Sequence, residues 1–269
     1  MFFVSFRVFV MKIISNSFFK ESSSRSLEEP FKIDIDVENF AKKTLRFLLI
    51  VVSILVFCSL LGDVIRSITP DFPLRDFLAY RFAVRNDHNF PTLYSSLALL
   101  FCAVLLGFIS CLKHRVKDRY TIGWQILAIT FVYLSIDELI GLHEALSKPM
   151  HNLGVNGFFH NAWVVPGFIV LSVFLLCFYK FFRHLPRSTQ YLTALSAFLA
   201  IGGAFGVELL NGYYKYLNGE ENWGYILLTT VEEVMEMLGI VLFIYTLLIY
   251  LPKMGVKRIK WVLNVNRND

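Results

Sequence analysis

The chain has 269 residues, of which 56% are hydrophobic and only 17% charged, with a formal net charge of +5. Soluble domains carry about a quarter charged residues, so this composition argues against a soluble protein. The basic residues stand in short clusters between long apolar runs, which argues against nucleic acid as a partner and favours membrane lipid.

The N-terminal region, residues 1–43, is expected to be a flexible cytoplasmic segment, because residues 15–43 are rich in Ser, Glu and Lys. Its first residues, 1–11, are apolar, but Arg7 interrupts them and the basic start of a signal peptide is missing. Translation could therefore begin at Met1 or at Met11.

Long apolar runs follow, each close to the ~20 residues that a helix needs to cross ~30 Å of hydrocarbon. They predict an all-α polytopic membrane helix bundle of six spans, because a backbone in lipid must satisfy its own hydrogen bonds. The expected transmembrane domain is 44–251, with spans at 44–62, 91–112, 121–146, 161–179, 188–210 and 223–251.

Two segments outside the spans are expected to touch the membrane. In the outer loop, 64–90, the apolar residues of 74–85 recur at helical spacing with Arg and Asp between them, which predicts a short interfacial helix. The tail, 252–269, is basic and amphipathic and is expected to lie on the inner leaflet.

The distribution of Lys and Arg predicts the orientation. With the N-terminus in the cytoplasm, 20 of the 26 Lys and Arg residues flank the inner ends of the spans and 6 lie outside. Basic residues concentrate on the cytoplasmic side of membrane proteins, so both termini are predicted to be cytoplasmic.

Acidic residues stand in or at the ends of three spans, without Lys or Arg beside them on those helices. Each such charge costs about 2.5–3.5 kcal/mol at a helix centre and less toward the interface, so pairing, protonation, water or metal must offset it. The helical rise places all of them in the outer third of the bilayer, together with two histidines. The set is Asp137, Glu138, His143 and Glu144 on the third span, His160 before the fourth, Glu208 on the fifth, and Glu232, Glu233 and Glu236 on the sixth.

Helical spacing predicts that part of this set faces the bundle interior. One predicted stripe joins Asp137, Gly141 and Glu144, and another joins Glu232, Glu236 and Gly239. Glu138 and Glu233 point about 100° away from these stripes. Gly202 and Gly206 form a pair of small residues that would let the fifth span approach a neighbour closely.

The first hypothesis is a membrane-embedded enzyme with a divalent metal, Zn, Fe or Mn, acting on an amphiphilic small molecule. Carboxylates and His suit these ions, and helix bundles build metal centres from facing helices. The predicted ligands are Asp137, His143, Glu144, His160, Glu208, Glu232 and Glu236, with Glu138 and Glu233 as catalytic bases on metal-bound water. The sequence contains no HExxH motif, so this site is argued from composition and depth alone.

Two alternatives use the same residues. In a small proton- or cation-coupled transporter the acids would titrate. In a structural or partner-binding subunit they would pair with Arg66, Arg81, Arg85 or His88 of the outer loop. The choice between enzyme, transporter and structural subunit stays open at this point.

The stretches NFPTLYSS, SIDELIGLHE and VEEVMEMLG, within residues 70–250, resemble a family of uncharacterised bacterial multipass proteins with DE(x4)HE and EExxEMxG motifs. The resemblance implies a similar fold and a location in the bacterial inner membrane, without an activity. The ceramidase-like membrane hydrolases also place acids and His at helix ends, but they use seven spans and an HxxxH pair, so their ligands are not transferred to this chain.

Overall fold

The computed structural model describes residues 31–70, 72, 74–86, 88–155, 157–220 and 222–263. The chain forms two units, a helical unit of Asp36–Arg258 and a second unit of Met1–Ile35 with Ile259–Asp269. The two start sites and most of the expected flexible segment, residues 1–30, lie outside the described residues.

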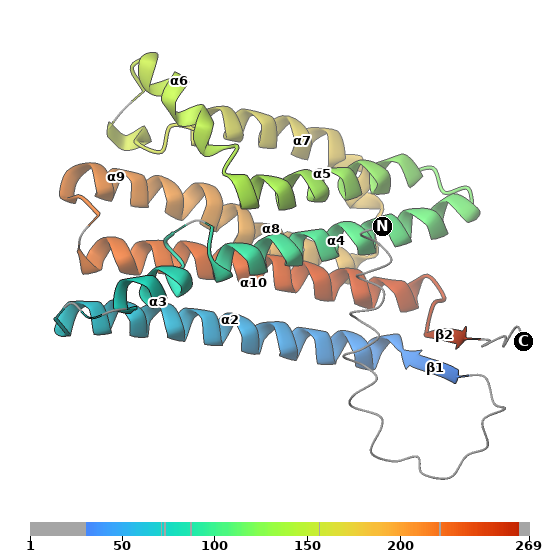
Figure 1. The fold of residues 1–269 in the computed structure, drawn as a ribbon. Helices are drawn as coiled ribbons and strands as arrows, with labels where there is room; N and C mark the ends of the chain where they lie inside the picture. The colour runs from blue at the N-terminus through green and yellow to red at the C-terminus, as the bar shows by residue number, and fades with distance from the viewer. Residues whose placement is uncertain are drawn as a thin grey trace, which may run out of the picture. The chain divides into compact units, whose positions relative to one another are not determined.

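The elements of the described chain are mostly helices (Figure 1). They are β1 (Phe31–Asp36), α2 (Val37–Ile68), α3 (Arg75–Phe82), α4 (Phe90–Arg115), α5 (Thr121–Ile140), the 3-10 turn η1 (Glu144–Leu146), α6 (Ser147–Asn152), the 3-10 turn η2 (Gly157–Phe159), α7 (Val164–His184), α8 (Arg187–Ile201), the π-helical segment η3 (Gly202–Val207), α9 (Glu208–Asn218), α10 (Trp223–Lys253) and β2 (Arg258–Leu263).

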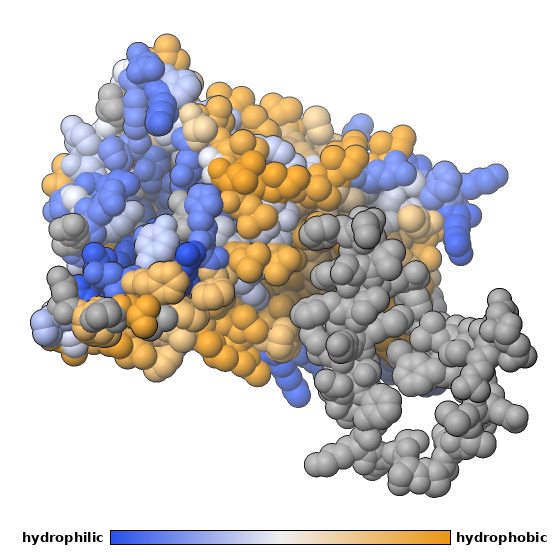
Figure 2. Space-filling model, in the orientation of Figure 1, coloured by the Kyte–Doolittle hydropathy of each residue, from blue (hydrophilic) through white to orange (hydrophobic). Residues whose placement is uncertain are grey.

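Six helices of the described chain are long and apolar enough to cross a membrane: α2, α4, α5, α7, the continuous helix Arg187–Asn218 and α10. The prediction of an all-α bundle with six spans is therefore confirmed. On the face shown in Figure 2, apolar residues cover the middle of the helical bundle and polar residues lie toward its ends. Phe57 of α2 and Leu176 of α7 are 65% and 77% exposed, as lipid-facing side chains should be.

The boundary of the first span differs from the prediction. Helix α2 begins at Val37 rather than near residue 44. The Asp36 carboxylate accepts hydrogen bonds of 3.0 Å from the backbone N–H groups of Glu38 and Asn39, which caps the helix. The first turns are polar, so hydropathy could not detect them even though the backbone is already helical.

The first part of the tail forms a strand. Arg258–Leu263 is β2, which pairs with β1 in a two-stranded sheet. Polar and apolar residues alternate along its first four residues, RIKW, which is the two-residue period of a strand. The location of the tail on the inner leaflet stays a prediction.

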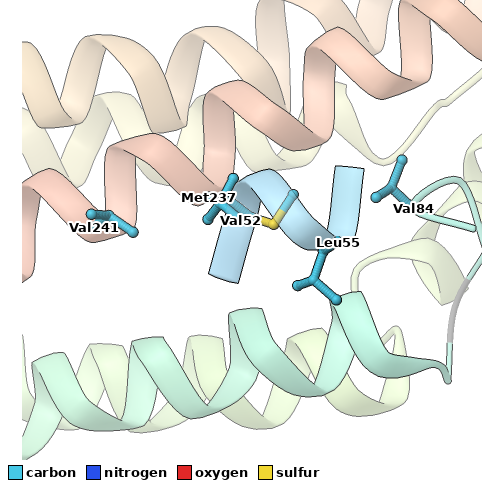
Figure 3. Packing of buried hydrophobic residues seen from close by; sticks show 5 residues of the cluster. All are labelled: Val52, Leu55, Val84, Met237 and Val241. Atoms are coloured by element: carbon cyan, nitrogen blue, oxygen red, sulfur yellow. The ribbon is translucent and has the colours of Figure 1, made fainter. Parts of the chain in front are cut away.

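Helix α10 is the central helix of the helical unit and packs against α2, α4, α8, η3 and α9 (Figure 1). Its contact with α2 is apolar, because Val52 and Leu55 of α2 pack with Met237 and Val241 of α10 in one buried cluster (Figure 3). Val84, which follows α3, completes the cluster.

Small residues allow α8 and α10 to approach closely. A Cβ on Gly239 would lie 2.6 Å from the backbone nitrogen of Ala200, so only glycine fits there. The Ser196 hydroxyl donates a 2.8 Å hydrogen bond to the Gly239 carbonyl at the same contact. Short side chains that let backbones meet are the usual basis of helix packing in membranes.

Helices α4 and α5 are joined by a reciprocal serine contact. The Ser96 hydroxyl donates to the Ser135 carbonyl at 2.7 Å, and the Ser135 hydroxyl donates to the Ser96 carbonyl at 2.9 Å. Both residues are buried, so these bonds form where water cannot compete.

The outer loop contains a short helix, α3, as its spacing predicts, and α3 packs on α2. Its position at the membrane surface stays a prediction. The backbone of Ala79 lies close to Gly62: a Cβ added to Gly62 would lie 3.3 Å from the Ala79 Cα. After α3, Arg85 forms an ion pair with the buried Asp63 of α2, and the Val84 N–H donates to the Ser59 hydroxyl at 3.0 Å.

Candidate functional site

The candidate site lies where α5 and η3 end and where α9 and α10 begin, at the predicted outer end of the bundle. Helix α5 stops at Ile140, and Gly141 follows it in the left-handed region with φ of +62°. Glycine adopts this conformation without a Cβ clash, so the chain can turn sharply there.

That turn overturns the predicted stripe on the third span. Glu144 lies in the turn η1 beyond the helix and is exposed, so it does not continue the face of Asp137. Instead, His143 folds back on Asp137 and makes two bonds with its carboxylate. The backbone N–H of His143 donates to Oδ1 of Asp137 at 2.9 Å, and the ring nitrogen Nδ1 of His143 lies 2.8 Å from Oδ2.

The pairing affects the charge of His143. Burial by itself would lower the pKa of this imidazole, but the hydrogen bond and the negative charge of Asp137 outweigh burial and raise it. The Trp163 ring meets the imidazole edge to face, with centroids 4.5 Å apart. The imidazole of His143 therefore contacts both the Asp137 carboxylate and the Trp163 ring. We call Asp137 and His143 the dyad.

Trp163 links the dyad to the fifth span. Its indole Nε1–H donates a 3.1 Å hydrogen bond to Oε1 of Glu208, the first residue of α9. Glu208 directly follows the π-helical segment η3. A π-helical segment changes the angular position of every later residue on a helix, so η3 determines which way Glu208 points.

The centre of the site is a pair of carboxyl groups from different helices. Glu208 lies close enough to Glu232 for its charge to act on the Glu232 carboxyl group. Glu232 is 7% exposed and also accepts a 2.9 Å hydrogen bond from Nδ2 of Asn211. The same Nδ2 donates to the Thr229 hydroxyl at 2.8 Å, while the buried Oδ1 of Asn211 has no partner among the described residues.

Glu236 lies one turn further along α10 and is half-buried. It is close enough to Glu138 and Glu208 for their charges to act on it. A Cβ on Gly203 would lie 2.8 Å from the Glu236 Cγ and 2.9 Å from the Glu232 carbonyl oxygen. The close approach predicted at Gly202 and Gly206 occurs at Gly202, where a Cβ would lie 3.2 Å from the Met235 Cε, and most tightly at Gly203; a Cβ on Gly206 meets nothing within 4 Å.

We call Asp137, His143, Trp163, Glu208, Asn211, Glu232 and Glu236 the acidic cluster. Glu138 adjoins it through its charge. Glu144 is exposed in η1, and Glu233 is half-buried on α10, about 100° around the helix from Glu232.

His160 lies in a separate contact. Its carbonyl accepts a 2.8 Å hydrogen bond from His151 Nε2, and the two rings are 5.8 Å apart. Burial, together with the positive charge of Lys215, lowers the pKa of His160. The contacts described for His160 are with His151 and Tyr216 rather than with the acidic cluster, and its role as a metal ligand stays a prediction.

Arginines of the outer loop bind residues of α2, of α3 and of the loop itself. Arg85 pairs with Asp63, and Arg66 pairs with Asp76 at 3.5 Å. Arg81 donates to the His88 carbonyl at 3.4 Å and lies over the Phe77 ring. This geometry does not support the alternative in which these arginines neutralise the acids of the other spans.

Two members of the cluster were not predicted as site residues. Asn211 stands three residues after Glu208, and this helical spacing in an apolar span was the available signal. From the sequence, Trp163 is expected only to belong to the aromatic belt at the membrane surface. No sequence pattern indicates that an indole donates a hydrogen bond to a carboxylate on another helix.

The described residues contain no group of three or more His, Cys, Asp or Glu side chains arranged to hold a metal ion. Metal binding by the seven predicted ligands stays a prediction.

The fold and the acidic cluster define an α-helical multi-pass membrane protein with carboxyl groups inside the bundle. The chain belongs to a family described as Domain of unknown function (DUF8692), which it matches over residues 44–251. This match agrees with the resemblance to an uncharacterised family. No curated protein matches the chain, and no solved structure does.

Proposed function

We propose that this protein is a proton-coupled membrane transporter in which the acidic cluster binds and releases a proton. The observation that carries the proposal is the placement of Glu232, which is buried in the bundle, accepts a hydrogen bond from Asn211 and lies close enough to Glu208 and Glu236 for their charges to act on it. Carboxyl groups that lie close together away from water carry several negative charges only at a high cost in free energy, so we expect a proton or a cation among them. Lys215, on the same helix as Glu208, forms its ion pair with Glu220 at 2.6 Å instead.

Neighbouring groups extend the pair into a series of titratable side chains. His143 lies close enough to Glu208 for their charges to interact, and Glu236 has the same relation to Glu208 and to Glu138. Series of Asp, Glu and His within membrane helices mark proton relays in pumps and transporters. This supports proton movement within the cluster, with the Asp137–His143 dyad at its loop side.

Infrared titration of the full chain in lipid nanodiscs tests the proton site directly. If the acidic cluster holds a proton as proposed, the C=O stretch of a protonated carboxylic acid should persist at neutral pH. Glu232→Gln should remove that band, whereas Glu220→Gln should leave it, since Glu220 lies outside the cluster and its side chain is 56% exposed. A wild-type spectrum without the band at neutral pH would refute the proton site.

Flux measurements separate transport from a structural role. Purified chain in vesicles with an entrapped pH-sensitive dye should admit protons under an imposed potential faster than empty vesicles do. Glu232→Gln should abolish this flux and Glu220→Gln should retain it. Equal flux in both variants would contradict a role for the cluster in transport.

The metal-dependent enzyme stays a second candidate because of one contact. Asp137 binds Nδ1 of His143, and a carboxylate in this place orients a histidine whose Nε2 can bind a metal. Zn, Fe or Mn bound near the cluster, with an amphiphilic substrate, would be the form of this proposal. Elemental analysis of detergent-purified protein tests it: stoichiometric metal that Glu236→Gln and His143→Gln release would support the enzyme, and its absence from folded wild type would remove it.

The location in a bacterial inner membrane and the cytoplasmic termini belong to the same proposal. They rest on the distribution of Lys and Arg and on the sequence resemblance. Cysteine labelling from either side of the membrane, with a single cysteine introduced at Lys117 or at Lys148, tests this orientation.

A further inference from the structure

A second feature lies at the predicted inner end of the bundle, about 30 Å along α10 from Glu232. There the C-terminal ends of α4, α7 and α10 meet the start of α8 around a cavity of about 460 Å³. Cavities that bind small molecules commonly have volumes of about 300–1,000 Å³. The acidic cluster does not include any residue that lines it.

The charged residues that line this cavity are all basic. They are Lys113, Arg115 and Lys253. Within the described part of the chain, one of these basic residues, Lys113, forms an ion pair, with Asp118 at 2.9 Å. The cavity therefore has an excess of positive charge.

Lys253 keeps its charge without a carboxylate in its hydrogen bonds. Its ammonium group donates to the hydroxyls of Ser188 at 2.6 Å and Thr189 at 3.2 Å. Hydroxyl partners orient an ammonium group but do not neutralise it. An ammonium group held in this way is suited to an anion that enters the cavity.

The remaining wall is apolar and aromatic. Leu112, Met254 and Val256 line the cavity beside Tyr250, which is buried and stacks on Trp124 with centroids 5.3 Å apart. A free inorganic anion would gain nothing from this wall, whereas an amphiphile would place its apolar part there.

We propose that this cavity binds the phosphate group of an anionic membrane lipid. Lys113, Arg115 and Lys253 supply N–H donors to the phosphate oxygens, and the apolar wall receives the lipid beyond the headgroup. Basic pockets between membrane helices on the cytoplasmic side recognise anionic headgroups in this way. Cations that only offset the partial negative charge of helix C-termini would explain each basic residue separately, but not their convergence on one cavity.

Native mass spectrometry of the detergent-purified full chain tests the proposal with phosphatidylglycerol and phosphatidylcholine as probes. Wild type should retain phosphatidylglycerol in preference to phosphatidylcholine. Arg115→Gln/Lys253→Gln should weaken phosphatidylglycerol binding about tenfold or more, because each basic residue near a membrane surface contributes on the order of a fivefold gain in affinity.

Lys43→Gln/Arg46→Gln is the matched control. It removes the same charge from exposed residues of α2, at the same end of the bundle, and should retain the preference. Equal loss in the two double variants would show nonspecific surface attraction and overturn the cavity. Displacement of the lipid by inorganic phosphate at equal concentration would identify a free anion and overturn the lipid. Unchanged thermal unfolding of both variants in an uncharged detergent should accompany the supporting result.

Discussion

Asn211 of α9 donates one hydrogen bond to Glu232 of α10, at 2.9 Å, and another to Thr229 one turn earlier on α10. A single buried amide therefore connects the two helices that carry the central carboxyl pair. Truncation of Asn211 to alanine should leave Glu232 and Thr229 without their donor.

The expected loss for Asn211→Ala is about 1–3 kcal/mol in the free energy of unfolding, the usual cost of an unsatisfied buried polar group. Thermal unfolding in mild detergent measures it. Asn218→Ala is the control, because Asn218 is exposed and its side chain donates to the Tyr214 carbonyl of its own helix at 3.2 Å. Its effect should stay within about 0.5 kcal/mol. Equal destabilisation by the two changes would contradict the bridging role of Asn211.

Gly203 and Gly206 lie in the same π-helical segment but differ in their surroundings. A Cβ on Gly203 would lie 2.9 Å from the Glu232 carbonyl oxygen, whereas a Cβ on Gly206 meets nothing within 4 Å. Gly203→Ala should therefore destabilise the protein by about 1–3 kcal/mol through overpacking. Gly206→Ala should be neutral or stabilising. Comparison of the two midpoints of thermal unfolding tests this, and a reversed order would show that η3 does not pack on α10 in this way.

The ion pair between Asp63 and Arg85 fixes the outer loop on α2, and the Asp63 side chain is only 3% exposed. Arg85→Met should cost about 3–5 kcal/mol, because it leaves a buried carboxylate without its partner. Arg66→Met removes a more exposed pair with Asp76 and should cost less than about 1 kcal/mol. Asp63→Leu/Arg85→Met should recover most of the loss in thermal unfolding. If the double variant were no more stable than Arg85→Met, the loss would not come from the unpaired carboxylate.

The dyad of Asp137 and His143 predicts a pH dependence of stability. Because Asp137 raises the pKa of His143 in the folded state, the folded state binds a proton more tightly than the unfolded state does. The stabilisation is therefore complete below the ordinary histidine value of 6.5 and is lost as pH rises through the raised pKa. The thermal midpoint of wild type should fall over this range, and His143→Gln should flatten the decline. An identical decline in the variant would assign it to other groups.

The sequence by itself determined the architecture. Runs of apolar residues near the length of a membrane span predict helices, because lipid offers the backbone no hydrogen-bond partners. The six spans and the helix α3 follow from hydropathy and spacing, and the positions of the acids along their spans follow from the helical rise.

Only the tertiary structure decided which polar groups meet. The sequence could not indicate that the chain turns at Gly141, which removes Glu144 from the face of Asp137 and returns His143 to it. Nor could periodicity reveal η3, because a π-helical segment breaks the 3.6-residue spacing on which a face is assigned. Hydropathy depends on composition along the chain, whereas the proximity of Glu208 to Glu232 depends on the rotation of two helices about their axes, and packing at Gly203 and Gly239 sets that rotation.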